Sequence, residues 1–575
     1  MKNTTRLILC LLLALALSFS SCIKQSPSDV SGEYSDVTFD DSSVVSTGDE
    51  NSGEEPEFLR NGVYFKDLSY ERPDFDAIYA KINHIDTLYQ SSADAGVVYD
   101  EFESLVDMMW EANTAYGLLN IYQSLDTADS VIADEMVVVS ESFTKVQQSY
   151  YILAEKLLDS SYSDTLFGDL SDAEKDEIRF NAYLFDDEFV ALSAKLTELE
   201  NKYIDSMSLT VFADGKEMTL QDVLDTYGYS SYIKAFNLAA GKLYLEIVDI
   251  YKAITKKAGF SSYADFAYKS DYYRDYTPGD SKKLHGYVSK YITPLFTAMS
   301  KKVSYYDSKK KNSPFDNEEV LTNYFNTVSP DMVNAFKFMK KYGLYSIESG
   351  ENRQQGAYTT FLNSYDIPFI FQNISDDYSD IQTFIHEFGH FYAYYLHGED
   401  LPFMIDIDEI HSQANELLFL PYFEDIYGSK AAKTISMFTI YSNLGSVISG
   451  CLFDEFEQLV FAGDYDSVDE LNLLFEDLCE KYQIPYSQYD WVRVHHLFLY
   501  PFYYISYATS LIPSFEIYAH SVNDRDGGIG MYNSLMAKSV NAGGFMALLE
   551  SSGFSNPFDE KTIKDIAETI SALNK

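Results

Sequence analysis

The chain has 575 residues, of which 46% are hydrophobic, and this is enough to bury a large core. Its 42 basic and 89 acidic residues give a net charge of −47. Such a charge repels the phosphates of nucleic acids, so we expect no nucleic-acid partner. Beyond Cys22, only Cys451 and Cys479 remain, which excludes a disulfide framework and leaves one bridge or two buried thiols.

Residues 1–21 are predicted to be a secretory leader. Lys2 and Arg6 precede an apolar stretch from Leu7 to Phe19, which is too short to span a bilayer. The segment ends in Ser-Ser-Cys, which resembles a bacterial lipobox and predicts lipidation of Cys22. The alternative is ordinary signal cleavage beside an incidental cysteine.

Residues 22–55 are rich in Ser, Asp, Gly and Glu and contain little that could pack into a core. They are predicted to form a disordered acidic tether. Together with the leader, this predicts a protein outside the cytoplasm that is lipid-anchored to the bacterial cell membrane and touches the membrane through that anchor only. No later segment is a convincing membrane span.

Residues 56–350 show apolar residues at spacings of three and four, which is typical of helices separated by short turns. Clear examples are Val97 to Leu125, Glu188 to Met207 and Leu238 to Ala258. We predict an N-terminal helical lobe that carries no motif for chemistry of its own.

Residues 351–575 are predicted to form a second, catalytic lobe. The β-prone runs Gly356 to Phe361 and Pro368 to Asn373 flank a turn-like Asn363 to Asp366, which predicts neighbouring strands of a small sheet. Helical patterns then resume, and the glycine-rich Asp524 to Gly530 is predicted to be a flexible connection.

The stretch Thr383 to Gly398 reads TFIHEFGHFYAYYLHG, and within it His386 and His390 lie one helical turn apart on the same face. Buried imidazoles need partners that an apolar core does not offer. Two imidazole nitrogens at this spacing can bind one zinc ion while the adjacent Glu387 reaches the attacking water. The alternative is a core helix whose histidines bond to other side chains.

The helix that carries this motif has predicted ends. Ser379 to Gln382 has the form of a capping box, and Gly398 stands where a helix usually stops. Gly389 inside the helix costs about 1 kcal/mol relative to alanine, which predicts a close approach by another element at that point.

Zinc needs a third protein ligand, and the segment from Asp408 to Glu416 offers one. Glu409 is far enough from His390 for the chain to turn and return antiparallel on a second helix, capped by Asp406 or Asp408. Glu416 lies two turns further on the same face and is predicted to orient a zinc-binding histidine. The rivals for the ligand position are Asp406, Asp408, His411 and Glu416.

A third cluster lies further along the chain. His495 and His496 are followed by Tyr500, Tyr504 and Tyr507 at helical spacing. Phenol and imidazole groups can donate hydrogen bonds to a developing oxyanion. Because the chain contains 49 tyrosines, core packing is the alternative for the tyrosines alone.

These motifs resemble those of the thimet-oligopeptidase family of zinc metallopeptidases, in particular its bacterial oligoendopeptidase F branch. His386 to His390 looks like the first zinc helix of the family, and Glu409 to Glu416 looks like the second. Phe502 to Thr509 resembles its tyrosine-rich helix. Asn541 to Gly544 and Asn556 to Asp559 are similar to its C-terminal segment.

The strand region resembles the family's segment that lies along the substrate. The likeness covers Gly356 to Tyr358 and the strand Pro368 to Asn373. It implies that the substrate-binding residues are Gly356, Ala357, Tyr358, Phe369 and Phe371.

The sequence departs from the family pattern in two places. The link from His390 to Glu409 is shorter than in the thimet branch and is similar to that of zinc aminopeptidases. The spacing also leaves open which histidine takes the family's role, because His496 fits the bacterial branch and His495 fits the thimet branch.

The resemblance implies a mainly α-helical, two-lobed metallopeptidase with a deep substrate channel and a small β-sheet next to the zinc helix. One zinc ion would be bound by His386, His390 and Glu409. Glu387 would act as the general base and would later deliver the proton to the leaving amine.

The oxyanion would be stabilised by Tyr504 or Tyr507 together with one of His495 and His496. The implied function is hydrolysis of internal bonds of short unstructured peptides at the cell surface, by a monomer. A zinc aminopeptidase and a peptide-binding lipoprotein without catalysis are the alternatives.

Overall fold

The computed structural model describes residues 58–573 except 171, 184–186, 207–208, 214, 308–312 and 376. The predicted leader (1–21), Cys22 and the predicted tether (22–55) lie outside the described residues, and they stay predictions. Within the described part, the fold is mainly helical with two small sheets, which confirms the predicted fold class.

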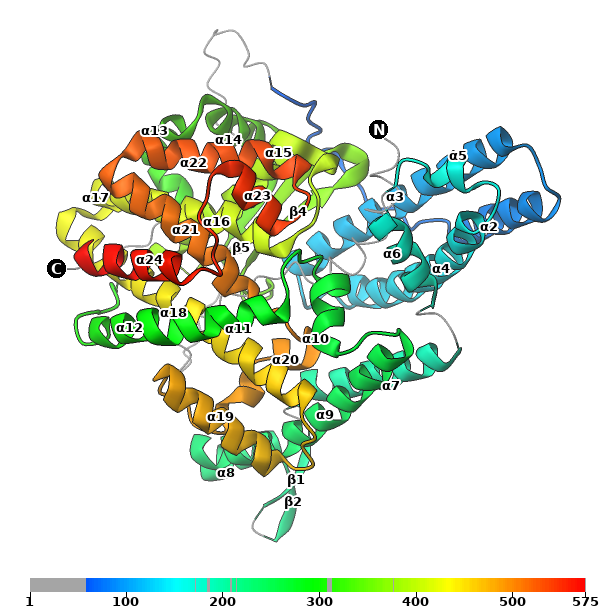
Figure 1. The fold of residues 1–575 in the computed structure, drawn as a ribbon. Helices are drawn as coiled ribbons and strands as arrows, with labels where there is room; N and C mark the ends of the chain where they lie inside the picture. Colours follow the sequence, from blue (N-terminus) through cyan, green and yellow to red (C-terminus); the bar gives the residue numbers. More distant parts are fainter. Residues whose placement is uncertain are drawn as a thin grey trace.

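A block of α-helices opens the described chain and extends away from the rest of the molecule (Figure 1). Its three long helices each follow an aspartate, Asp74, Asp94 or Asp129, whose side chain accepts hydrogen bonds from the first turn. They bury a core of their own, drawn from residues between 75 and 182. The helices of this N-terminal block are α2 (Phe75–Gln90), α3 (Ala95–Leu125), α4 (Ser130–Leu158), α5 (Ser163–Phe167) and α6 (Asp172–Tyr183).

The chain then forms further helices and a hairpin that protrudes at the bottom of Figure 1. The strands β1 (Thr210–Ala213) and β2 (Lys216–Thr219) pair antiparallel, and the sequence pattern did not predict them because each has only four residues. The other elements of this part are α7 (Asp187–Ile204), α8 (Leu220–Tyr227), α9 (Tyr229–Lys257), α10 (Tyr263–Phe266), the π-helical turn η3 (Ala267–Asp271), α11 (Pro278–Tyr287), α12 (Thr293–Met299), α13 (Glu318–Val328) and α14 (Pro330–Tyr342).

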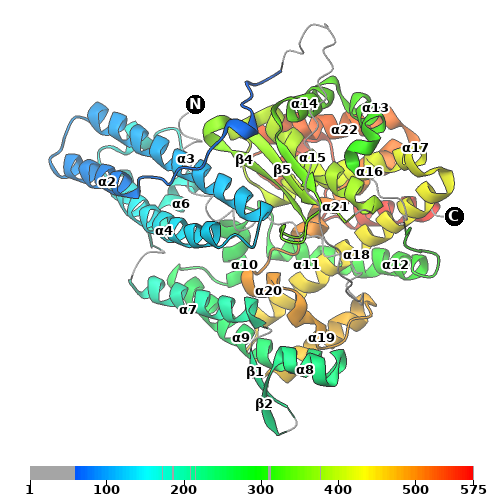
Figure 2. The ribbon, with the colours of Figure 1, turned by 180° about the vertical axis from the view of Figure 1, so that it is seen from behind.

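A three-stranded sheet lies beside α3 (Figure 2). β4 (Ala357–Leu362) and β5 (Ile367–Asn373) pair antiparallel, as predicted. β3 (Tyr345–Glu348), which was not predicted, pairs parallel with the other side of β5. The order β3-β5-β4 therefore makes β5 the central strand and leaves β4 at the edge.

Helices make up the rest of the described chain. By length and composition α18 could cross a membrane, but more than half of its most apolar stretch is buried, as in a core helix. The prediction of a flexible connection at Asp524 to Gly530 is wrong, because Asp524 accepts a hydrogen bond from Gly527 N and caps α22 (Arg525–Lys538). The helices are α15 (Tyr378–His397), α16 (Ile405–Phe419), α17 (Phe423–Tyr427), α18 (Ser429–Ala462), α19 (Val468–Tyr482), α20 (His496–Leu499), α21 (Ser506–Asn523), α22 (Arg525–Lys538), α23 (Phe545–Ser552) and α24 (Glu560–Leu573).

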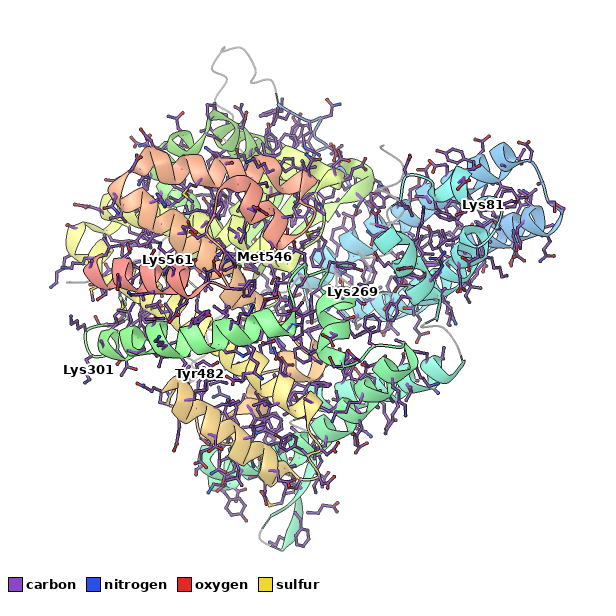
Figure 3. The ribbon with its side chains drawn as sticks, viewed as in Figure 1. Lys81, Lys269, Lys301, Tyr482, Met546 and Lys561 are labelled. Carbon is purple, nitrogen blue, oxygen red and sulfur yellow. The ribbon has the colours of Figure 1, made fainter. Side chains whose placement is uncertain are left out.

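A second, larger core joins the helices before the sheet to those after it. Cys451 and Cys479 are free and buried, so of the two predicted states the buried thiols are the one present. Figure 3 shows Lys81 on the N-terminal block, well apart from Met546 and Lys561 on the C-terminal helices. The predicted lobe boundary at residue 350 stays a prediction.

Candidate metal and catalytic site

The helix α15 carries the histidine motif. It begins after Asp377, which forms a capping box with Asp380, so its cap lies two residues before the predicted cap at Ser379. It ends at Gly398, as predicted. The motif thus lies in the middle of a continuous helix, where side chains four residues apart share one face.

His386 and His390 converge on Glu409 of α16. One ligand-capable atom from each of the three residues lies within 4.8 Å of the others. The distance from His386 Nε2 to Glu409 Oε2 is 3.7 Å. A tetrahedral metal with ligands at about 2.0–2.2 Å spaces those ligands by about 3.4 Å. This donor set of two imidazoles and a carboxylate therefore fits one metal ion.

Glu416 contacts the other ring nitrogen of His386. The distance from His386 Nδ1 to Glu416 Oε1 is 2.7 Å, and Gln382 Nε2 donates to Glu416 Oε2 at 2.5 Å. Thr439 of α18 in turn donates to Gln382 Oε1 at 3.2 Å. A carboxylate on one imidazole nitrogen fixes the ring so that the other nitrogen can face a metal, which fits the predicted role of Glu416. Sequence reasoning missed Gln382 and Thr439.

The rival ligands have partners of their own. The helix α16 begins after Met404, so the predicted cap at Asp406 or Asp408 is wrong. Asp408 instead accepts the Met404 N–H from inside the helix at 3.2 Å. Asp406 accepts hydrogen bonds from Arg274 and Thr509, and His411 Nε2 lies 2.8 Å from Ser539 Oγ.

Gly389 lets α15 and α16 touch. A Cβ at this position would lie 2.4 Å from the backbone oxygen of His411 on α16, far inside van der Waals contact. Beside it, Asn415 Nδ2 donates to the backbone oxygen of Ile385 at 2.6 Å. The close approach predicted from the glycine is confirmed, and α16 is the element that approaches.

Glu387 is buried and faces the edge strand β4. Thr359 Oγ1 lies 2.8 Å from Glu387 Oε2 and 2.9 Å from the Glu387 backbone oxygen. Sequence reasoning missed Thr359, although its place next to Tyr358 in a predicted strand was an available signal. The pocket beside Glu387 is lined by Tyr358, Thr359, His390, Ala393, Tyr394, Leu401, Phe403, Ile405, Asp408, Glu409 and His411.

The residues predicted to bind substrate separate into two groups. Ala357 and Tyr358 begin the edge strand β4, Gly356 directly precedes it, and Tyr358 lines the pocket. Phe369 and Phe371 are fully buried, because they belong to the central strand β5. Their side chains offer no surface to a peptide, and both edges of β5 are paired, whereas β4 pairs with β5 on one side only.

The segment Tyr500 to Ile505, here called the tyrosine loop, is irregular. Pro501 and Phe502, whose φ is 66°, interrupt the helical path between α20 and α21. The predicted helical spacing of the tyrosines is therefore wrong, and of the three only Tyr507 lies in a helix.

The tyrosines nevertheless gather around His496. Its ring centroid lies 5.1 Å from those of Tyr503 and Tyr504 and 6.1 Å from that of Tyr507. The ring of His495 lies 4.1 Å from that of His496. The structure thus brings the predicted histidines and tyrosines into one cluster.

Burial sets the protonation of this cluster. It lowers the pKa of His496 well below the ordinary value, with a smaller contribution from the charge of His495. It also lowers the pKa of His495 and raises the pKa of Tyr504. At neutral pH these groups are neutral imidazoles and protonated phenols, which can donate hydrogen bonds.

Tyr507 of the cluster and the candidate metal ligand Glu409 belong to neighbouring helices. The helix α21, which carries Tyr507, packs against α16, which carries Glu409. Thr509 Oγ1 of α21 donates to Asp406 Oδ1 of α16 at 3.0 Å. The contact between α16 and α21 therefore links the two parts of the candidate site.

Comparison with known proteins identifies the first part of the chain. Residues 65–172 match the family model described as the peptidase M3 N-terminal domain. This range covers most of the N-terminal block. No curated protein matches the chain by sequence.

Solved structures share the fold over most of the chain. An oligoendopeptidase F from Bacillus anthracis str. Ames has a TM-score of 0.71 at 21% identity, over 89% of this chain and 98% of its own. PZ peptidase A, solved with an inhibitor, has a TM-score of 0.69 at 20% identity, over 88% and 98%. Metallocarboxypeptidase 1 of Trypanosoma cruzi has a TM-score of 0.56 at 10% identity, over 85% and 98%. At such low identities, this structural likeness shows a common fold.

The motifs, the matched domain and the fold agree. The first helices match the family model of the peptidase M3 N-terminal domain, and 89% of the chain shares the fold of the oligoendopeptidase F structures. These findings confirm the resemblance of this chain to the M3 oligoendopeptidase family.

Proposed function

We propose that the chain is a zinc-dependent oligoendopeptidase that hydrolyses internal bonds of short, unstructured peptides. The observation that carries the proposal is the convergence of His386, His390 and Glu409, with Glu387 buried beside them. A structural zinc site is usually closed by four protein ligands, whereas three ligands beside a base are typical of a catalytic site.

Zinc would be held by His386, His390 and Glu409, and it would supply Lewis acidity that polarises the scissile carbonyl and acidifies water. Glu387 accepts the proton of the attacking water and later gives it to the leaving amine. The hydrogen bond from Thr359 to Glu387 Oε2 holds the carboxylate in place for both transfers.

The oxyanion is stabilised by hydrogen bonds from the tyrosine cluster. Tyr504 and Tyr507 are the leading donors, and His496, at the centre of the cluster, is favoured over His495. Their burial supports this role, because donors in a site with little water stabilise a developing charge more than donors in water do.

The substrate binds as an extended chain along β4. An edge strand offers unpaired backbone groups, so a peptide can be held by main-chain hydrogen bonds that tolerate many side chains. The helix α3 packs against β4 and against the turn that follows β4, where Asn113 donates to Asn363 at 3.2 Å and the Thr114 hydroxyl lies 2.8 Å from that of Ser364 (Figure 2). Helices on this side would line the substrate channel and exclude folded proteins.

The shared fold does not decide between an endopeptidase and an exopeptidase, because a metallocarboxypeptidase also has it. The test uses a peptide of about ten residues with both ends blocked, the same peptide with free ends, and a folded protein, each incubated with the zinc-loaded chain. We expect cleavage of both peptides and none of the folded protein. Failure on the blocked peptide alone would favour an exopeptidase, such as the zinc aminopeptidase.

A second experiment addresses the non-catalytic alternative. Chelation should abolish hydrolysis and zinc should restore it, whereas a peptide-binding lipoprotein would bind the blocked peptide without cutting it. The Glu387→Gln variant serves as the control that keeps the metal ligands and lacks the base.

The cellular setting is part of the proposal. We place the enzyme outside the cytoplasm, as a monomer anchored by acylated Cys22. Cys22→Ser should release it from membranes or leave it unprocessed. A native N-terminus without acyl groups, measured by mass spectrometry, would contradict the proposed lipid anchor.

A further inference from the structure

Five consecutive residues, Tyr272 to Tyr276, lie in the connection between η3 and α11 and contact several distant parts of the chain. We call this segment the junction. Tyr272 OH donates to the backbone oxygen of Pro501 in the tyrosine loop at 3.0 Å. Tyr273, at a φ of 51°, donates from its hydroxyl to Glu177 Oε1 of α6 at 2.9 Å. One short segment thus touches both the tyrosine loop and the N-terminal block.

Arg274 is the buried centre of the junction, since its side chain is 0% exposed. Its Nε lies 3.2 Å from Asp406 Oδ2 on α16, and its Nη2 donates to Ser506 Oγ at the start of α21 at 2.8 Å. Asp406 lies one turn before Glu409, and Ser506 lies directly between the tyrosine loop and Tyr507. One guanidinium therefore joins the helix of the proposed ligand Glu409 to the start of the helix that carries Tyr507.

Other contacts fix the orientation of this guanidinium. It lies 4.5 Å from the ring centroids of Tyr268 and Tyr272. Asp406 Oδ2 also accepts from Tyr276 OH at 2.8 Å. The planar group is thus held on its faces by aromatic rings and along its edge by oxygen atoms, an arrangement that the point charge of a lysine does not reproduce.

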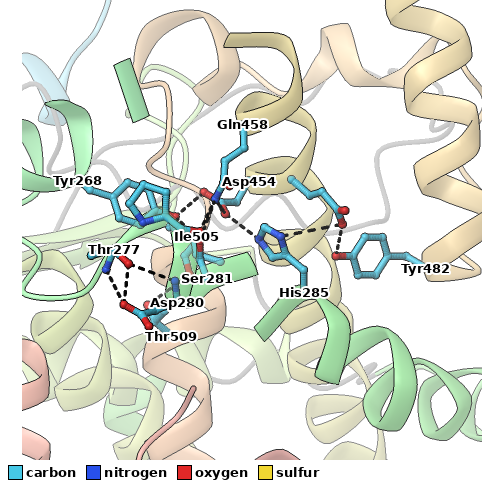
Figure 4. A network of polar contacts seen from close by, with 12 residues as sticks. Tyr268, Thr277, Asp280, Ser281, His285, Asp454, Gln458, Tyr482, Ile505 and Thr509 are labelled. Atoms are coloured by element: carbon cyan, nitrogen blue, oxygen red, sulfur yellow. Dashed lines mark hydrogen bonds and ion pairs between the residues drawn. The ribbon is translucent and has the colours of Figure 1, made fainter. Parts of the chain in front are cut away.

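The ring of Tyr268 is itself anchored in the core. Its hydroxyl donates to Asp454 Oδ1 of α18 at 2.7 Å, and the other oxygen of Asp454 lies 2.7 Å from His285 Nε2 (Figure 4). Gln458 and Ser281 complete this buried network. The ring beneath Arg274 therefore belongs to a network that ties α11 to α18.

A buried ion pair alone is weak evidence for stability, because desolvation of the two charges offsets much of their attraction. What Arg274 and Asp406 add is geometry, since they fix the start of α16 against the start of α21. We propose that Arg274 is a positioning residue for peptide hydrolysis, which sets the tyrosine cluster at the distance from the metal ligands that the oxyanion requires. This inference rests on the proposed function.

The test compares Arg274→Lys with Ser506→Ala, which removes only the hydroxyl that Arg274 contacts on α21. Arg60→Lys is the matched control, because Arg60 is also mostly buried and paired, with Asp366 as its partner. We expect Arg274→Lys to lower kcat by about 10- to 100-fold with little change in KM or zinc content. Ser506→Ala should act in the same direction with a smaller effect, and Arg60→Lys should leave kcat unchanged.

A double-mutant cycle separates positioning from a general loss of structure. In a Tyr504→Phe/Tyr507→Phe background the donors are gone, so Arg274→Lys should lower kcat by no more than about threefold. An equal loss in both backgrounds, a loss of zinc in Arg274→Lys, or a normal kcat in both Arg274→Lys and Ser506→Ala would overturn the inference. A zinc-loaded wild-type chain that cuts no peptide would overturn the proposed function, and this inference with it.

Discussion

The helix pair α15 and α16, which carries the proposed metal ligands, and the tyrosine loop are held in place in different ways. His386, His390 and Glu409 come from two helices that are consecutive in the chain, and their contacts lie within 34 positions of one another. The tyrosine loop is held by residues from distant parts of the chain, such as Tyr272 and Glu457, whose carboxylate accepts from Phe502 N at 3.0 Å.

This difference separates local from long-range organisation within one candidate site. The helix pair contains its own donors, its own orienting carboxylate at Glu416 and its own close contact at Gly389. The tyrosine cluster depends on the junction, α18 and α21. We therefore expect substitutions in the helix pair to affect metal binding and the general base directly. Substitutions around the tyrosine cluster should act by changing its position.

The largest expected effect comes from replacing Glu387, the proposed general base on the helix pair. Glu387→Gln should lower kcat by about 100- to 10,000-fold, because the proton acceptor is lost, while bound zinc stays unchanged. The measurements are peptide hydrolysis and metal content of the purified variant. Glu424→Gln on α17, an exposed glutamate, is the control. Near-normal hydrolysis by Glu387→Gln would contradict the assigned role.

Next come the donors of the tyrosine cluster. Tyr504→Phe or Tyr507→Phe should lower kcat by about 100- to 1,000-fold for the true oxyanion donor, with zinc retained. The variant of the other tyrosine should lose little activity, which identifies the donor. If neither change lowers kcat, the tyrosines pack the core and do not stabilise the oxyanion.

A smaller effect is expected where Glu416 orients His386. Glu416→Ala should weaken zinc binding or activity by about 10- to 100-fold, because the imidazole loses the carboxylate on its Nδ1. Zinc titration against a competing chelator measures this. Glu409→Ala should cost more, since it removes a direct ligand, and the reverse order would exchange the two roles.

The smallest effect concerns the contact of the junction with the N-terminal block. Burial raises the pKa of Glu177 from 4.5 to about 7, although the hydrogen bond from Tyr273 lowers it somewhat. The folded state therefore binds this proton more tightly than the unfolded state, and its contribution to stability is full below pH 4.5 and is lost as the pH rises through 7.

Glu177→Gln should remove this dependence. Its free energy of unfolding should exceed that of the wild type by about 1–3 kcal/mol at pH 8 and by little at pH 5, measured by chemical denaturation. Glu141→Gln, an exposed glutamate on α4, is the control. If the wild type instead gains stability relative to Glu177→Gln between pH 5 and pH 8, the pKa of Glu177 is lowered by folding and not raised.

The sequence predicted the locally organised features of the molecule and missed those that depend on long-range contacts. The helical spacing of His386 and His390, the glycine between them and the paired strands after Gly356 depend on neighbours in the chain, and the fold bears out their local structure. The order of the sheet could not be predicted, because β3 joins β5 by a parallel pairing that leaves no turn signal. That order buries Phe369 and Phe371, which the family resemblance predicted to bind the substrate.

The path of the tyrosine loop was also beyond the sequence pattern. Spacing alone suggested a helix through Tyr500 and Tyr504, whereas Pro501 and the positive φ of Phe502 require support from elsewhere in the chain. That support comes from Tyr272 and Glu457, more than 40 positions away in sequence. The partners Thr359 and Arg274 were missed for the same reason, since each meets its target only in the folded chain.

The most direct test of the metal site is a crystal structure of the zinc-loaded chain with anomalous diffraction at the zinc edge. We predict one strong peak within about 2.0–2.2 Å of His386 Nε2, a ring nitrogen of His390 and an oxygen of Glu409, with Glu416 remaining on His386 Nδ1. A peak coordinated by Glu416 with Glu409 turned away, or no peak at these residues, would contradict the proposed centre.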